Sequence, residues 1–331
     1  PDQVLDVGLE TNLDDLKVKV VHTHGRRGEK YMTLSHCWGP RSHVTTQLTT
    51  QCLVEYETEG ISLQQLPNTF RHAVLFTREL GVRYLWIDPL CIIQDDTQDW
   101  ERESVTMRSV YENSHLTIAA AASPSAQGGL FPFLPPKHPP HNISGTTPDG
   151  KPFELSASLR MDHSGSKLPL LKRGWAFQER NLSPRTLFFA EREVLWECKT
   201  ELDCQCEFGG FYEEENMKSW HHLLAPETAA MSRADKLDQF QLWHKLVKYY
   251  SSLELSVKSD RLPAISGIAE VIRRLRGLQL TDYYYGLWSD SFPFDLSWYQ
   301  LVPGAERHSG VPSWSWASVH NQVHFPFFLW K

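Results

Sequence analysis

Long apolar runs, basic patches and closely spaced cysteines are all scarce in this sequence of 331 residues. Its longest almost wholly apolar stretch, residues 116–122, is far shorter than the roughly 20 residues of a membrane-spanning helix. The chain does not open on a basic and then apolar leader. A net charge of −7 without a basic stripe argues against a general nucleic-acid binder. Six cysteines are too few for a disulfide scaffold, so we expect a soluble cytoplasmic protein.

The common nucleotide-binding and hydrolase motifs are missing as well. The sequence has no Walker loop, no G-x-G-x-x-G, no H-E-x-x-H and no G-x-S-x-G. Cys198, Cys204 and Cys206 have the spacing C-x5-C-x-C, without the paired C-x2-C knuckles of structural zinc. His221 and His222 are near enough in sequence to complete a site, but no spacing holds them there. We therefore expect no metal and no cofactor.

Apolar periodicity in the first part of the chain indicates strands that alternate with helices. It predicts strands at 17–22, 31–36, 84–87 and 115–121, and helices at 67–80 and 100–113. Helices that connect successive strands favour a mainly parallel sheet with helices packed against it. We therefore predict an α/β core over residues 1–125.

The second part of the chain begins after a stretch rich in proline, glycine and serine. Residues 126–150 in this stretch are predicted to be a loop or linker. Beyond it we predict strands near 186–190 and 193–198, helices near 231–253 and 262–276, and a terminal β segment with Trp314 and Trp316. Residues 151–331 are thus expected to form a mixed α+β extension, rich in tryptophan and arginine, that packs on the core.

Polar residues follow two of the predicted strands. Ser35, His36, Cys37 and Trp38 end one strand, and Asp88 directly follows another. Because ligands bind beyond the carboxyl ends of strands in open parallel sheets, these residues are candidates for one cleft. Side chains alternate along a strand, so His36 points away from Ser35 and Cys37, which disfavours a dyad of His36 with Cys37. The alternative is a core histidine with satisfied hydrogen bonds beside a tryptophan that only packs.

Glu103 falls on the inward face of the predicted helix 100–113. That face carries the stripe formed by Trp100, Ser104, Met107, Val110 and Tyr111. A carboxylate on a buried face is costly unless it is paired or used, because burial disfavours its charge. Glu103 is therefore a candidate catalytic residue. The alternative is a structural glutamate bonded to a neighbouring hydroxyl or arginine.

A third cluster, between Arg173 and Arg180, combines two arginines with Gln178, Glu179 and two aromatic residues. A fork of arginines can clamp a phosphate or a carboxylate through paired hydrogen bonds. It can equally join two structural layers through salt bridges. The residues alone favour this structural role.

Several motifs of this chain resemble the fungal heterokaryon-incompatibility (HET) domain family. They include Leu34-Ser-His-Cys-Trp-Gly39, Tyr84-Leu-Trp-Ile-Asp88, Leu90-Cys-Ile-Ile-Gln-Asp-Asp96, Arg173-Gly-Trp175, Gln178-Glu-Arg180 and Pro312-Ser-Trp-Ser-Trp-Ala-Ser318. Members of this family act in non-self recognition and cell death. The resemblance implies the same role here.

The HET domain is in turn remotely similar to Toll/interleukin-1 receptor domains, many of which cleave NAD. This similarity implies a hydrolase whose substrate, NAD⁺, loses nicotinamide while Glu103 stabilises an oxocarbenium-like ribose. For this reaction, we expect Ser35, His36 and Asp88 to hold catalytic positions as well, because they line the same strand-end cleft and would orient the ribose or water. The residues expected to bind the substrate are Trp38, Trp100, Cys37, Cys91, Arg173, Gln178 and Arg180. Toll-type enzymes act when oligomers complete the pocket, so a homo-oligomer is expected.

Two other functions are compatible with the same residues. One is a biosynthetic enzyme for a small metabolite, with Cys37, His36 or Cys91 as nucleophile or base. The other is an assembly module without catalysis, in which Glu103 is purely structural. Reactive cysteines would favour the first, and oligomers that consume no substrate would favour the second.

Overall fold

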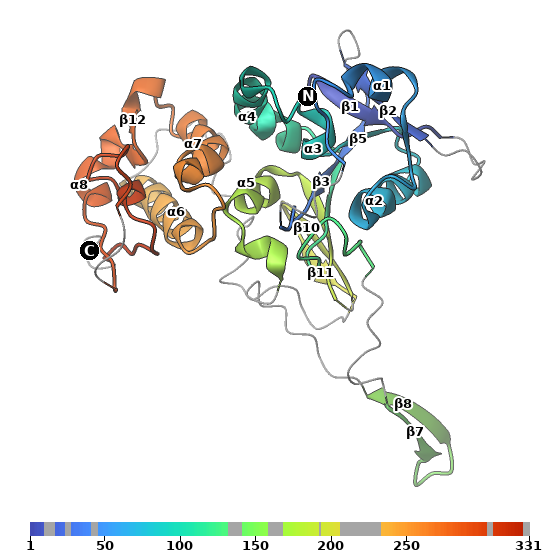
Figure 1. The fold of residues 1–331 in the computed structure, drawn as a ribbon. Helices are drawn as coiled ribbons and strands as arrows, with labels where there is room; N and C mark the ends of the chain where they lie inside the picture. Colours follow the sequence, from blue (N-terminus) through green and yellow to red (C-terminus); the bar gives the residue numbers. More distant parts are fainter. Residues whose placement is uncertain are drawn as a thin grey trace.

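The computed structural model describes residues 1–9, 17–23, 28–40, 46–131, 141–157, 168–191, 193–205, 233–302 and 307–326. Figure 1 shows a β-sheet with its helices beside a second, mostly helical body formed by the last third of the chain. One continuous apolar core includes buried residues of both, for example Leu34 in the sheet and Ile268 in the helical body. The described helices include none that is long and apolar enough to cross a membrane.

In the part of the chain that the structure describes, the main sheet has nine strands, and four parallel strands form its centre. These are, in spatial order, β9 (Arg185–Phe189), β6 (Leu116–Ala119), β3 (Tyr31–Ser35) and β5 (Tyr84–Trp86). Antiparallel strands extend both sides: β10 (Val194–Cys198) and β11 (Leu202–Cys204) beyond β9, and β1 (Gln3–Asp6), β2 (Lys17–His22) and β4 (Ile61–Ser62) beyond β5. The prediction of a mainly parallel sheet is therefore wrong, because short connections such as 190–193 permit only antiparallel pairing.

The predicted helices of the core are present, with shifted ends. They are α2 (Asn68–Glu79) and α4 (Thr97–Glu112). The structure adds three helices that were not predicted: α1 (Leu53–Thr58), α3 (Asp88–Cys91) and α5 (Gly174–Leu182). Helix α4 begins three residues before the predicted start, because the Asp96 carboxylate accepts hydrogen bonds from the backbone N–H groups of Gln98 and Asp99. The buried face of α4 includes Glu103 and Met107, as the helical periodicity predicts.

The boundary predicted near residue 125 does not separate two sheets, since β9, β10 and β11 belong to the same sheet as β3. The predicted linker contains a strand, β7 (His141–Thr146), which pairs with β8 (Pro152–Ala157). Figure 1 shows this hairpin well away from the rest of the protein. It is almost entirely exposed.

The C-terminal body contains α6 (Arg233–Ser251), α7 (Pro263–Leu275), α8 (Phe292–Asp295) and the small hairpin of β12 (Tyr283–Tyr284) and β13 (Leu287–Trp288). In the described part of the body, short 3-10 helices accompany these elements at Lys258–Arg261, Leu280–Asp282, Ser289–Ser291 and Trp316–Ser318. Another, Pro169–Lys172, directly precedes α5 in the core. The predicted terminal β segment is wrong, because the hydroxyl of Ser315 caps a helical turn at Trp316 rather than leaving the chain extended.

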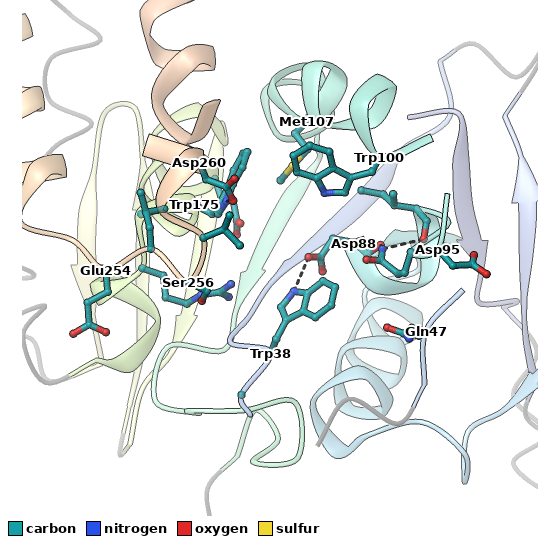
Figure 2. Close-up of a pocket in the computed structure, with 18 residues that line it drawn as sticks. Trp38, Gln47, Asp88, Asp95, Trp100, Met107, Trp175, Glu254, Ser256 and Asp260 are labelled. Atoms are coloured by element: carbon teal, nitrogen blue, oxygen red, sulfur yellow. Dashed lines mark hydrogen bonds between the residues drawn. The ribbon is translucent and has the colours of Figure 1, made fainter. Parts of the chain in front are cut away.

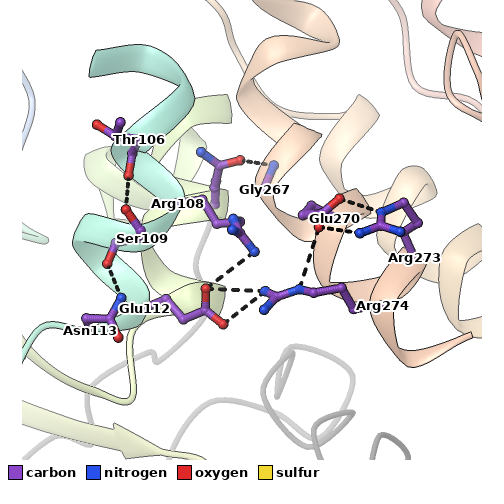
Figure 3. Close-up of polar contacts among 10 residues, drawn as sticks. Thr106, Arg108, Ser109, Glu112, Asn113, Gly267, Glu270, Arg273 and Arg274 are labelled. Atoms are coloured by element: carbon purple, nitrogen blue, oxygen red, sulfur yellow. Dashed lines mark hydrogen bonds and ion pairs between the residues drawn. The ribbon is translucent and has the colours of Figure 1, made fainter. Parts of the chain in front are cut away.

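Helix α7 joins the C-terminal body to the core by packing against α4 and α5. The side chain of Gln178 accepts a 2.7 Å hydrogen bond from the Gly267 backbone N–H, and a Cβ at Gly267 would crowd that side chain. Figure 3 shows the charged rim of this contact, where the Glu112 carboxylate forms ion pairs with Arg108 of its own helix and with Arg274 of α7. The two bodies therefore meet through a close helix crossing with an ion-pair network at its edge.

Candidate functional site

A cleft of about 650 Å³ opens where β3 and β5 end, in the size range of small-molecule sites. Trp38 and Gly39 follow β3, and Asp88 lies just beyond β5. Helix α4 contributes Trp100 and Met107. Figure 2 shows these side chains on one side of the cleft, facing those from α5 and the C-terminal body. The cleft thus lies at the carboxyl ends of two neighbouring parallel strands.

Asp88 and Trp38 form a direct contact at the base of the cleft. The indole N–H of Trp38 donates a 2.7 Å hydrogen bond to Oδ2 of Asp88. The other carboxylate oxygen, Oδ1, has no hydrogen-bond partner among the described residues, and His36 Nδ1 lies 3.7 Å from it. The His36 ring packs edge-on against Phe70, with ring centroids 4.9 Å apart. Asp88 therefore has one buried carboxylate oxygen without a hydrogen-bond partner among the described residues.

A sharp turn at Gly39 holds Trp38 in place. The φ angle of Gly39 is +79°, in the left-handed region that favours glycine. A Cβ atom at this position would overlap the Cβ atom of Ser125. Glycine is therefore required here for both its backbone angle and its size.

The first turns of α5 bring Arg173, Trp175 and Glu179 to the cleft. The Ser35 hydroxyl donates to Oε2 of Glu179, although 144 residues separate the two in sequence. Arg173 donates to the backbone carbonyl of His36. Sequence reasoning did not select Glu179, although it lies in the predicted arginine cluster. Its one signal was a carboxylate beside two aromatic residues.

A segment of the C-terminal body forms the opposite side of the cleft. We call residues 254–257 and Asp260 the C-terminal wall. Two backbone hydrogen bonds tie this wall to the start of α5: Gly174 N–H to Glu254 O, 2.8 Å, and Glu254 N–H to Lys172 O, 2.7 Å. The indole N–H of Trp175 donates to Oδ2 of Asp260 at 2.9 Å. The cleft is therefore built jointly by the core and the C-terminal body.

The titratable groups at the base of the cleft are strongly shifted. Burial, together with the nearby Glu179 charge, raises the pKa of Asp88 to about 7. Burial also raises the pKa of Glu179, although the hydrogen bond from Ser35 opposes this shift. Burial and the positive charge of Arg173 lower the pKa of His36 to about 3, so His36 is neutral. Asp88 can therefore accept or release a proton near neutral pH.

Seven predicted site residues do not line the cleft: Ser35, His36, Cys37, Cys91, Glu103, Gln178 and Arg180. Glu103 is 2% exposed and lies on the buried side of α4, where its Oε2 accepts a 3.1 Å hydrogen bond from Thr106. Gln178 contacts Gly267 of α7. Arg180 forms a paired buried salt bridge with Glu197, at 2.8 and 2.9 Å. The structure thus gives the last two residues contacts between layers of the fold.

The two predicted cysteines are buried near the cleft. Burial raises the pKa of Cys37, which packs with Ala119 in an apolar cluster apart from His36. Burial also raises the pKa of Cys91, to about 12. Both thiols are therefore protonated at neutral pH, which disfavours a cysteine nucleophile.

Only some of the candidate zinc ligands lie among the described residues. Cys206, His221 and His222 lie outside the described residues. Among the residues that the structure describes, no group of three or more histidine, cysteine, aspartate or glutamate side chains has the arrangement to hold a metal ion.

A known protein family matches the segment that forms most of this cleft. Residues 31–179 match the model of the heterokaryon incompatibility protein (HET) family. The match spans 149 of the 331 residues, so it is this segment of the chain that is similar to the HET family. A HET domain implies a protein of heterokaryon incompatibility and cell death. Searches among curated proteins and among solved structures each found no match.

The HET match covers most of the cleft. It begins at the first residue of β3 and ends at Glu179. It therefore includes Asp88 and both ends of the hydrogen bond between Ser35 and Glu179. The C-terminal wall lies outside the match, so a segment beyond the matched residues completes the cleft.

Proposed function

We propose that this protein hydrolyses the bond between nicotinamide and ribose in NAD⁺, within the cleft at the ends of β3 and β5. The observation that carries the proposal is a pair of carboxyl groups, Asp88 and Glu179, beside three indole rings in a cleft of substrate size. Carboxylates stabilise the oxocarbenium-like ribose of such a reaction, and indole rings stack on flat heterocycles.

The reaction requires little covalent chemistry. The bond between C1′ of the ribose and the pyridinium nitrogen breaks, and its electron pair neutralises the ring, which leaves as nicotinamide. The oxygen of a water molecule then bonds to C1′, and the proton of that water passes to a carboxylate. Asp88 suits this last role, because its pKa of about 7 lets it accept a proton at neutral pH. Glu179, oriented by Ser35, is assigned the electrostatic role.

The proposal moves the role expected of Glu103 to Asp88 and Glu179. Glu103 does not line the cleft, whereas both of these carboxyl groups do. The parallel centre of the sheet, with its cleft at the strand ends, also supports the remote similarity to Toll/interleukin-1 receptor domains. We keep that similarity as part of the proposal.

The test is nicotinamide release from NAD⁺ by the purified protein, at low and high protein concentration. We expect Asp88→Asn and Glu179→Gln each to lower the rate by about 100-fold or more, because each removes one charge from the reacting centre. Glu103→Gln and the surface control Asp149→Asn should keep most of the activity. Asp149 is exposed in the turn of the β7–β8 hairpin, which Figure 1 shows well away from the main sheet.

Each outcome of this test has a defined meaning. A specific rate that rises steeply with protein concentration would support a homo-oligomer as the active form. Loss of activity in Glu103→Gln alone would return the catalytic role to α4. No release by the folded protein at any concentration would refute the hydrolase and favour the assembly module.

A further inference from the structure

The residues that line the cleft carry much more negative than positive charge. Its carboxyl groups are Asp88, Asp95, Glu179, Glu254 and Asp260. Among the described lining residues, Arg173 is the single cationic side chain, and its guanidinium already donates to the His36 carbonyl. Burial and then the negative charge of Glu179 raise the pKa of Asp88, while the charge of Arg173 opposes this shift only in part. A cationic ligand would relieve this repulsion.

The tryptophans of the cleft are prepared for the same kind of ligand. The N–H groups of Trp38 and Trp175 are already bonded to Asp88 and Asp260. These two indoles therefore have only their ring faces left for a ligand. Trp100, which is 41% exposed, adds a third ring. An indole face carries negative electrostatic potential and attracts cations, especially when carboxylates lie nearby.

Asp260 connects these two features. It lies on the C-terminal wall, and its hydrogen bond to Trp175 sets the orientation of that ring. Figure 2 shows Asp260 and Trp175 together across the cleft from Trp100 and Asp88. One residue outside the HET match thus supplies both a negative charge and the position of an aromatic face.

We propose that the cleft selects a planar cation, an N-alkylated pyridinium ring, and that Asp260 determines this specificity. The inference rests on the proposed function, because the nicotinamide ring of NAD⁺ is such a cation. The two phosphates of NAD⁺ are anions, which the acidic cleft disfavours. The preferred substrate is therefore the nucleoside, nicotinamide riboside, followed by its monophosphate and then by NAD⁺.

The first test measures binding and does not depend on turnover. Isothermal titration calorimetry compares 1-methylnicotinamide, a cation, with neutral nicotinamide. We expect the cation to bind about tenfold more tightly or better, in line with cation–π attraction in a partly desolvated site. Asp260→Asn keeps an oxygen that accepts the Trp175 N–H but loses the charge, so it should remove most of this preference. Asp149→Asn, a surface control in the β7–β8 turn, should leave it unchanged.

The second test compares the release of nicotinamide from the riboside, the mononucleotide and NAD⁺. We expect kcat/KM to fall in that order, and Asp260→Asn to narrow the ratio between the riboside and NAD⁺ several-fold. Equal binding of cation and neutral ring, or a ratio unchanged in Asp260→Asn, would overturn the inference while the hydrolase stands. Selective cation binding without any turnover would support the inference and refute the hydrolase. The urea midpoint of Asp260→Asn shows whether that variant remains folded.

Discussion

Replacing Asp88 by asparagine should stabilise the protein at pH 8 and have a much smaller effect at pH 5. The Asp88 carboxyl group has an ordinary pKa of 3.8 in the unfolded chain, but a pKa of about 7 in the fold. Between these values the native state binds more protons than the unfolded state, so the free energy of unfolding falls as pH rises. Asparagine keeps an oxygen that accepts the Trp38 N–H and has no charge to bury.

The size of this effect follows from the pKa shift and the exposure of the side chain. Ionising a carboxyl group whose pKa has risen from 3.8 to about 7 costs about 4 kcal/mol of stability. Because 23% of the Asp88 side chain is exposed, we halve this figure and expect a gain of about 2 kcal/mol at pH 8. At pH 5 the gain should be below about 1 kcal/mol, because pH 5 lies only part of the way from the unfolded pKa of 3.8 to the folded pKa of about 7.

Urea denaturation at pH 5 and pH 8 measures this difference. Asp95→Asn is a matched control in the same cleft, because hydrogen bonds from Thr50 lower the pKa of Asp95. Its replacement should destabilise the protein at pH 8. A gain for Asp88→Asn that is the same at both pH values, or a loss at pH 8, would refute the reasoning. It would mean that Asp88 is not held against its ionisation.

Three further predictions concern groups around the cleft. Gly39→Ala should lower the free energy of unfolding by about 2 kcal/mol or more, because the new Cβ atom would overlap Ser125. Gly81 has a φ of +68° but open space around it, so Gly81→Ala should cost only about 1 kcal/mol, and equal urea midpoints for the two variants would contradict the overlap at Gly39. Arg180→Met should cost about 3–5 kcal/mol, because it leaves Glu197 charged and buried; a change below about 1 kcal/mol in urea denaturation would show that this pair is not needed. Cys91 should resist alkylation by iodoacetamide at pH 7.5 until the protein is unfolded, because its pKa is about 12; mass spectrometry of the native protein would reveal a modified Cys91 if this is wrong.

Local elements and their polar ends were predictable from the sequence. The strand at Lys17–His22 has the predicted limits, and α2 lies within one residue of its predicted ends. Both depend on side-chain periodicity within one segment, which local sequence expresses directly. The meeting of Trp38 with Asp88 was also foreseeable, because each follows an apolar strand and strand ends gather ligands.

The order and direction of the strands were decided by the tertiary structure. Periodicity marks a strand but does not say which neighbour it pairs with, so the antiparallel sides of the sheet were missed. The same holds for Glu103, whose buried face on α4 was predicted but whose neighbours were not. A helical wheel gives the direction of a side chain, while the elements packed there decide whether it meets a cleft or the core.

By itself, the sequence determined the HET motifs, most of the elements that carry them and the strand-end position of Asp88. The tertiary structure alone decided that Glu179 reaches Ser35 across 144 residues, and that Asp260 completes the cleft from outside the HET match. The physical reason is that hydrogen bonds between distant segments depend on how helices and strands pack. That packing is set by the shared apolar core and is not written in any one motif.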